Sequence, residues 1–229
     1  MAINLADLEG NPYIGVFCRL MGDVLICPPD TSSDFETKVS ETLGCGVHRT
    51  SAGSTNLHGS LLAANSKGLI APYFYSLGDL EKKGGEGEIP FGARSNLVIS
   101  EDHITAWGNN ILPSEKRALV NPDLSRGAVK MVEDTLDVEA AKGTIAGIKT
   151  VGSIACMNSK GMVVHPKASE DELQMVKDLF SLDVFTSTAN FGSPYLGASI
   201  LANDRGALMG SKSSGVELNR VENSLDIID

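Results

Sequence analysis

The chain lacks several features that would assign it to a membrane, to secretion or to metal chemistry. It contains no run of about 18 apolar residues, the length that a helix needs to span a bilayer. Its N-terminus shows no basic region followed by an apolar stretch, so no secretory signal is expected. Its four cysteines show no C-x-x-C spacing, which disfavours a zinc site and fits a reducing compartment. We therefore expect a cytoplasmic protein with no cofactor and no membrane partner.

Basic residues are also scarce, with 19 Lys and Arg against 29 Asp and Glu and a formal net charge of −10. Nucleic acid is bound through clustered basic side chains, so direct nucleic-acid readout is not expected. An acidic chain is compatible with docking on a basic protein surface and equally with simple solubility. The hydrophobic content of 42% is ordinary for a globular protein.

The chain does contain one hairpin sequence pattern, which is repeated five times. In the clearest copy, Gly152 precedes a short apolar run, an Asn-Ser-Lys-Gly turn follows at 158–161, and a second apolar run ends at Pro166. Asn and Gly suit such a turn because both tolerate left-handed backbone angles. The leading glycines are spaced by 44, 49, 44 and 45 residues, a period typical of repeat proteins. These glycines are Gly15, Gly59, Gly108, Gly152 and Gly197.

A helix and a third strand are predicted after each hairpin. Ser169-Glu170-Asp171-Glu172 and Ser214-Gly215-Val216-Glu217 are typical of capping boxes at helix starts. Ser33-Asp34-Phe35-Glu36 indicates a similar start, and Ser125 to Leu136 carries a helical apolar face. The repeating unit is therefore predicted to be β-β-α-β, with a length of about 45 residues. The short strand entries are expected at Val47, Ile89, Val138, Val184 and Ile227.

The two ends of the chain are predicted to complete each other. Asn11-Pro12-Tyr13-Ile14-Gly15 matches Ser193-Pro194-Tyr195-Leu196-Gly197, a segment that follows a third strand. Because a third strand precedes the matching segment at 193–197, a third strand is also expected before Asn11. Ile3–Leu5 is therefore predicted to be the third strand that the fifth repeat lacks. A ring closed in this way protects strand edges. We expect a single domain over 1–229, with repeats at about 13–55, 56–96, 97–148, 149–194 and 195–229 and with 1–12 closing the ring.

Two further expectations concern the interior of the ring and its second unit. The small residues of the third strands, such as those at 50–54 and 143–147, are expected to crowd a central axis, with the helices outside. In the second unit, Ser76–Lys83 is expected to form only a short helix, and Gly84–Glu88 is expected to form a loop.

A fivefold repeat of β-β-α-β units resembles the pentein fold, an α/β ring with pseudo-fivefold symmetry. Five motifs along the chain are specific in combination: Gly161-Met162-Val163-Val164-His165-Pro166-Lys167, Glu170-Asp171-Glu172-Leu173, Ala202-Asn203-Asp204, Trp107-Gly108-Asn109-Asn110 and Leu119-Val120-Asn121-Pro122-Asp123-Leu124. Through these motifs, and over nearly its whole length, the chain resembles the translation initiation factor 6 family, in its archaeal form.

This resemblance implies a ribosome anti-association factor that is not an enzyme and needs no cofactor. It implies binding to the large ribosomal subunit near the sarcin–ricin loop, chiefly through ribosomal proteins. Such a factor blocks premature joining of the small subunit and has a role in large-subunit maturation. We expect it to be a monomer.

The alternative is a pentein enzyme that modifies guanidino groups, as a hydrolase or an amidinotransferase, with a cysteine nucleophile and a histidine. In those enzymes the cysteine lies near the C-terminus, whereas no cysteine follows Cys156 here. Cys156 lies in an apolar strand, where a thiol acts as a small hydrophobe. His165 stands where other repeats carry Asn121 or Cys27, which indicates a turn-exit residue. We therefore expect no catalytic residue and no metal site.

The ribosome-binding surface has two candidates. The five hairpin turns should point to one end of the ring, where Asn65, Asn109, Asn158 and Asn203, with Asp204 and Arg205, would form a polar circle. Either the asparagines serve turn geometry alone, or part of the circle touches the ribosome. In the second case, acidic replacements of Asn109 and Asn203 should weaken binding with little change in melting temperature. The other candidate is the C-terminal segment 216–229, beside the N-terminal strand.

Overall fold

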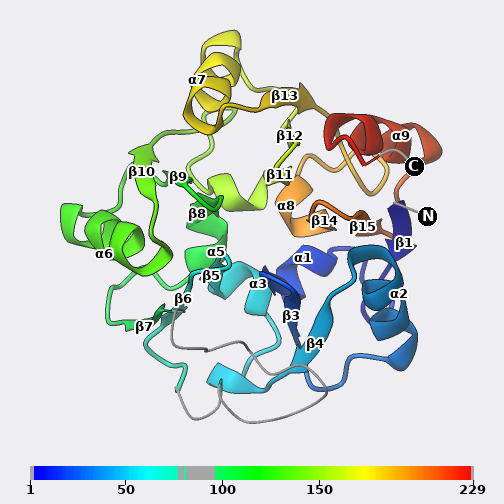
Figure 1. Cartoon of the computed structure of the whole chain (residues 1–229), viewed down its shortest axis with the longest axis horizontal. Helices are drawn as coiled ribbons and strands as arrows, with labels where there is room; N and C mark the ends of the chain where they lie inside the picture. Colours follow the sequence, from blue (N-terminus) through cyan, green and yellow to red (C-terminus); the bar gives the residue numbers. More distant parts are fainter. Residues whose placement is uncertain (1–2, 77–79, 81–95, 228–229) are drawn as a thin grey trace.

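The computed structural model describes residues 3–76, 80 and 96–227. The loop expected at 84–88 and the strand entry expected at Ile89 lie outside these residues, as does most of the short helix expected at Ser76–Lys83. The described residues contain five small sheets of three strands, and each sheet combines an antiparallel hairpin with one parallel strand. Figure 1 shows the sheets arranged around a centre, with the long helices outside.

The strands fall into three groups by their place in the sheets. The first hairpin strands are β2 (Arg19–Met21), β5 (Ala63–Ala64), β8 (Ile111–Pro113), β11 (Ala155–Met157) and β14 (Ile200–Ala202). The second hairpin strands are β3 (Val24–Cys27), β6 (Gly68–Pro72), β9 (Arg117–Val120), β12 (Gly161–Val164) and β15 (Ala207–Gly210). The parallel third strands are β4 (Gly46–Arg49), β7 (Asn96–Ser100), β10 (Glu139–Lys142), β13 (Asp183–Thr186) and β1 (Ile3–Ala6).

The helices are of two kinds. Helices of ten or eleven residues lie on the outside: α2 (Ser33–Leu43), α6 (Arg126–Leu136), α7 (Glu170–Phe180) and α9 (Gly215–Ser224). One-turn helices precede the hairpins: α1 (Ile14–Phe17), α3 (His58–Leu61), α5 (Trp107–Asn110), η2 (Val151–Ser153) and α8 (Leu196–Ser199). A further short turn, η1 (Ala52–Ser54), follows β4.

The N-terminal strand completes the sheet of the last repeat. β1 runs parallel to β15, with Ile3 opposite Ala207 and Ala6 opposite Gly210. The strand predicted at Ile3–Leu5 and its place beside the fifth repeat are therefore confirmed. Ile227, predicted to enter a strand, instead follows α9 outside any strand, because β1 already occupies the third position of that sheet.

The five leading glycines approach one another backbone to backbone. A β-carbon on Gly152 would clash with the carbonyl oxygen of Gly108, and each other glycine is related in the same way to its neighbour. The sequence of contacts passes from Gly108 to Gly59, then to Gly15, then to Gly197 and back to Gly152. Glycine is needed here because only a residue without a side chain allows so close an approach.

The prediction that the small residues of the third strands crowd the central axis was wrong. In every sheet the third strand lies at the edge opposite the first strand. The first strands face the centre, where Leu20, Ala64, Leu112, Met157 and Leu201 line one channel. The small residues after the third strands lie farther out, because each third strand pairs only with the outer side of its hairpin. The helices lie outside, as predicted.

The third strand of the second unit is β7, paired with β6 from Gly68–Asn96 to Pro72–Ser100. Leu97, Val98 and Ile99 form its middle. Register in a parallel pair is set by the partner strand, and this partner lies more than twenty residues away along the chain.

The predicted helix starts are confirmed with one shift. Ser125, Ser169 and Ser214 are the N-caps of α6, α7 and α9, and the last two form complete capping boxes. The cap of α2 is Ser32 and not Ser33, and its hydroxyl accepts the amide N–H of Phe35 at 3.3 Å. Ser32 has the extended backbone that an N-cap requires, whereas Ser33 is already helical.

Each apolar core lies between two neighbouring units. Phe35 and Val39 of α2, from the first unit, pack with Leu201 and Leu208 of the fifth. Val176 of α7, from the fourth unit, packs with residues of the third-unit hairpin. The outer helix of one unit therefore covers the sheet of the preceding unit. None of the helices among the described residues is long and apolar enough to cross a membrane.

Candidate docking faces and central channel

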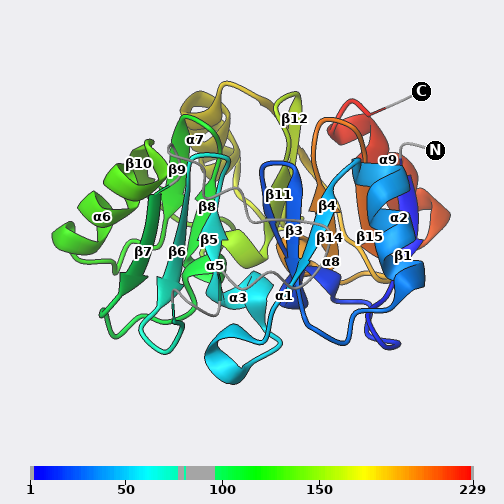
Figure 2. The same ribbon diagram turned by 60° about the horizontal axis from the view of Figure 1, so that its bottom comes forward.

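The arrangement of the five sheets around a centre has two ends of different character (Figure 2). We call the end that carries the hairpin turns the turn end, and the end that carries the one-turn helices the helix end. All five turns line one depression of about 600 Å³ at the turn end. The prediction that the turns gather at one end is confirmed by its lining residues, which include Gly22, Asn65, Glu115, Asn158 and Asp204.

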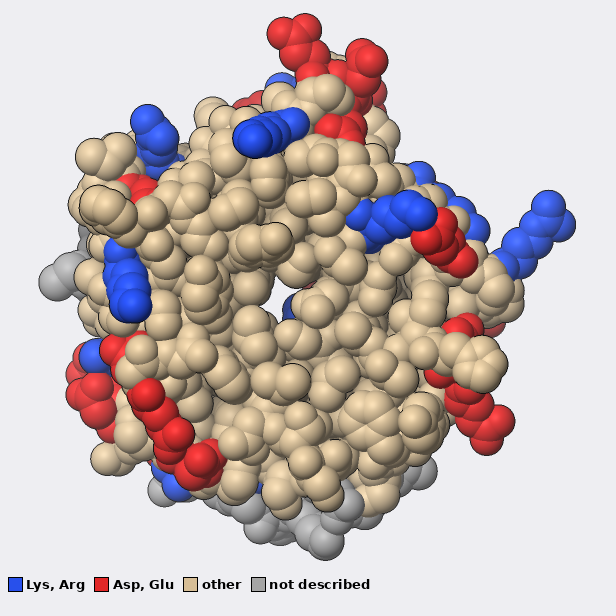
Figure 3. All heavy atoms as spheres, turned by 180° about the vertical axis from the view of Figure 1, so that it is seen from behind, with Lys and Arg blue, Asp and Glu red and all other residues tan. Residues whose placement is uncertain are grey.

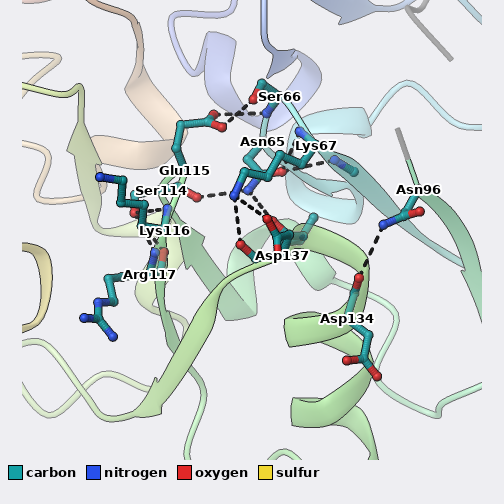
Figure 4. Close-up of polar contacts among 12 residues, drawn as sticks. Asn65, Ser66, Lys67, Asn96, Ser114, Glu115, Lys116, Arg117, Asp134 and Asp137 are labelled. Carbon is teal, nitrogen blue, oxygen red and sulfur yellow. Dashed lines mark hydrogen bonds and ion pairs between the residues drawn. The ribbon is translucent and has the colours of Figure 1, made fainter. Parts of the chain in front are cut away.

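Three turn asparagines, Asn65, Asn158 and Asn203, each link their hairpin to the helix of the next unit; Figure 4 shows the contacts of Asn65. The Asn65 Nδ2 group donates to the carbonyl oxygens of Leu136, at 2.8 Å, and Ser114, at 3.0 Å. Asn158 donates to Leu225 and Asn203 to Leu43, both at 2.8 Å. Leu136 and Leu43 are the last residues of α6 and α2, and Leu225 is the C-cap of α9. Such carbonyls have no partner within their own helix.

The residue two places after each asparagine strengthens the same link. Lys67 Nζ lies 2.7 Å from a carboxylate oxygen of Asp137, the C-cap of α6 (Figure 4). Arg205 Nη1 donates to the carbonyl of Gly44, the C-cap of α2, at 2.7 Å. A cation at a helix C-terminus is favoured by the helix dipole.

Asp204 is likewise engaged at the turn end, because its Oδ1 accepts the Ser159 amide N–H at 2.8 Å. Asn203, Asp204 and Arg205 therefore all contact neighbouring units. The expectation that Asn203 can be replaced with little change in melting temperature stays a prediction, although its amide contacts the partly buried backbone groups of Leu43 and Gly206, which argues against it.

Asn109 does not belong to the circle of turn asparagines. It lies in α5 at the helix end, half-buried, and its backbone N–H donates to Ala106 at 3.1 Å. It precedes the first hairpin strand, which carries the chain across the ring before the turn is reached. The second candidate surface lies beside the N-terminal strand as predicted, since Val221, Leu225 and Ile227 pack with Ile3. Residues 228–229 lie outside the described part.

The helix end exposes aromatic and apolar side chains. Leu57 and Tyr195 are N-caps of the one-turn helices α3 and α8 and are 42% and 48% exposed. Tyr73 and Phe74 follow β6, at the end of the strand away from its turn, and are also exposed. Figure 3 views this end and shows that the surface around the central opening is free of Lys, Arg, Asp and Glu, with blue atoms inside the opening and other charged side chains near the rim.

Phe191, 85% exposed, is the most exposed of these side chains. It has a φ of 62°, a left-handed backbone that few non-glycine residues adopt. Its amide N–H and that of Gly192 donate to the Glu217 carboxylate at 3.2 and 2.9 Å. Burial raises the pKa of this carboxyl, but its hydrogen bonds, including those from Ser214 and Thr188, outweigh that effect and lower the pKa to about 2. An ionised capping-box glutamate therefore holds Phe191 at the surface.

Sequence reasoning missed Phe191 and the channel. A signal for the loop was present, because Asn190-Phe191-Gly192 has the composition of a turn, but nothing local indicates that the Phe side chain faces solvent. The channel is visible as an opening in the centre of Figure 3 and is lined by residues of all five units, Arg19 among them. Such a site arises only when distant segments are brought together.

The described cysteines and histidines do not form a nucleophile and base pair. All four cysteines are buried, and burial raises the pKa of Cys156 to about 12, so this thiol is protonated at neutral pH. His165 Nδ1 accepts the Lys167 amide N–H at 3.1 Å, which confirms its place at the turn exit. Burial lowers the pKa of His58 to about 4, and its ring nitrogens lie 2.9 Å from Tyr75 Oη and the Thr50 carbonyl. No metal-binding group of His, Cys, Asp and Glu occurs among the described residues.

The repeated β-β-α-β units, with cores shared between neighbours, define the chain as a mixed α/β repeat protein. The chain belongs to the eIF-6 family, whose model matches residues 3–224. It is 38% identical over 223 residues to translation initiation factor 6 of Picrophilus torridus, covering 97% of this chain and 99% of the relative. It is 35% identical over 227 residues to translation initiation factor 6 of Methanosarcina mazei, covering 99% and 100%. Translation initiation factor 6 of Pyrococcus abyssi is 34% identical over the full length of both chains.

Proposed function

We propose that this chain is a translation initiation factor of the anti-association type, which binds the large ribosomal subunit and prevents premature joining of the small subunit. It acts in the cytoplasm as a monomer and takes part in large-subunit maturation. The name shared by its relatives supports the role in initiation. The burial and protonation of Cys156 argue against the guanidino-modifying enzyme as an alternative.

The proposed body of this factor is a single-domain, pentein-like ring with pseudo-fivefold symmetry, closed by its two chain ends. The cycle of contacts among the five glycines and the pairing of β1 with β15 support this shape. The cores shared between units support a single domain, because no unit buries a complete core of its own.

Docking through the helix end is part of the proposal, and the presentation of Phe191 is the observation that carries it. A strained, fully displayed aromatic residue is typical of a binding surface. The uncharged surface around the central opening at this end suits a protein partner better than a phosphate backbone. We infer that ribosomal proteins near the sarcin–ricin loop supply the contact, and the net charge of −10 would steer the factor toward such basic proteins.

Sedimentation of purified ribosomal subunits with added protein tests the function. We expect the chain to co-migrate with the large subunit and to reduce the fraction of joined ribosomes as its concentration rises. If subunits join equally well at saturating protein, the proposed function is wrong.

Two variants test the docking end. Phe191→Glu replaces the exposed aromatic side chain by a charged one and should weaken large-subunit binding by about tenfold or more, as loss of an aromatic anchor usually does. Arg205→Glu is the matched control at the turn end, and its affinity should be unchanged when the folded fraction of each variant is taken into account. Loss of binding in Arg205→Glu, with normal binding in Phe191→Glu, would instead assign docking to the turn end.

A further inference from the structure

Arg19, the first residue of β2, lies in the central channel. The channel holds a cavity of about 140 Å³, lined by three glycines and by mostly apolar residues such as Leu20, Ala64 and Ile111. The Arg19 Nη2 group donates to the Gly59 carbonyl oxygen in the neighbouring unit. The residue as a whole is half-buried, but its Nε is shielded from solvent and has no hydrogen-bond partner.

The charge of Arg19 is not balanced by a carboxylate. None of the ion pairs formed by the described residues includes it. Burial lowers the pKa of Arg19 to about 10, which leaves the guanidinium charged at neutral pH. Cys156, the other ionisable group that influences it, is a neutral thiol at that pH. A desolvated charge without a counter-charge is costly, so the channel attracts an anion.

We propose that the central channel binds one small monovalent anion, of the size of chloride or formate, against the guanidinium of Arg19. One cation in an otherwise uncharged wall is matched by one negative charge, whereas phosphate or sulfate would leave an excess charge in the same low-polarity surroundings. The volume accommodates such an anion with a few waters, each of which occupies about 30 Å³. The opening seen in Figure 3 gives access from solvent. The inference is independent of ribosome binding.

Bromide is a suitable probe, because its anomalous scattering identifies it in crystals. Crystals of the wild-type chain grown in sodium bromide should show one anomalous peak within hydrogen-bonding distance of the Arg19 guanidinium. Arg19→Met, which keeps the length and removes the charge, should abolish that peak, and Arg19→Lys should retain it. Arg117→Met, at the turn end, is the control and should leave the peak unchanged.

Thermal unfolding provides a second readout in solution. Sodium bromide at ten times the dissociation constant should raise the melting temperature of the wild type by about 3–6 °C above that in sodium gluconate of equal concentration. Arg19→Met should show no such difference between the two salts. The proposal is overturned if wild-type crystals show no bromide at Arg19, or if wild type and Arg19→Met respond equally to bromide. If Arg19→Met does not fold, the wild-type crystals and Arg19→Lys still decide the question.

Discussion

At the scale of single residues, the five central glycines are required for space and not for a special backbone angle. None of them has a positive φ, whereas glycines such as Gly44 at the end of α2 do. What each central glycine avoids is a clash between its own β-carbon and the backbone of the neighbouring unit. Backbone atoms cannot rotate away as a side-chain end can, so these positions tolerate no larger residue.

Gly152→Ala is therefore expected to destabilise the fold by about 3 kcal/mol or more, at the upper end of the cost of overpacking. Urea unfolding followed by circular dichroism measures the change. Gly127→Ala in α6 is the matched control, because its β-carbon would meet no atom closer than 3.8 Å and alanine favours a helix. Equal stability of the two variants would contradict the steric role of Gly152.

At the scale of elements, the capping boxes of α7 and α9 serve two purposes. Glu172 accepts the amide N–H groups of Ser169, at its own helix start, and of Gly147, in the loop of the preceding unit. Glu217 does the same for Ser214 and Gly192. Each glutamate thus joins a helix to the loop that follows the preceding third strand, and the pKa of each lies near 2 although burial alone would raise it.

Replacement of Glu217 by Gln should reduce the free energy of unfolding by about 2 kcal/mol at neutral pH, since hydrogen bonds to a charged acceptor are lost. The pKa of Glu217 is lowered by folding, from 4.5 to about 2. Its contribution is therefore fully present above pH 4.5 and is lost as the pH falls toward 2.

Unfolding measured over this pH range should show the difference between wild type and Glu217→Gln shrinking as the pH falls. Glu222→Gln, in the same helix but outside the capping box, is the control and should remain close to wild type throughout. A difference that stays constant over the whole range would show that the ionised form of Glu217 is not what stabilises the fold.

At the scale of the whole molecule, stability depends on contacts between units. The helix of each unit covers the sheet of the preceding one, and β1 joins the first residues of the chain to β15. Because the cores are shared, we expect the described units to unfold together in one cooperative transition.

Ile3→Asp tests the contribution of the N-terminal strand. Ile3 is 6% exposed and packs with residues of β15 and α9, so a buried carboxylate there should cost about 3 kcal/mol or more. Asn4→Asp adds the same charge at the next residue, which is half-buried on the other face of the strand, and should cost much less. Calorimetry measures both effects; a small cost for Ile3→Asp would mean that β1 contributes little to holding the ends together.

The sequence by itself determined the number of repeats, the β-β-α-β order, the capping serines and the strand at Ile3. These features follow from residues a few positions apart, such as Asn-Ser-Lys-Gly turns and Ser-x-x-Glu boxes, and from a period that repeats along the chain. The gathering of the turns at one end also followed from the repeat, because identical units in a ring place equivalent turns together.

Only the tertiary structure decided what those shared positions do. The sequence predicts that Asn203 is a turn residue, yet its amide contacts Leu43, 160 residues away. Asn109 was assigned to the turn end and lies at the other, and neither the display of Phe191 nor the burial of Arg19 has a local signature. Each depends on which backbone atoms of a distant unit lie nearby, and local turn and helix chemistry is the same whether or not such a neighbour is present.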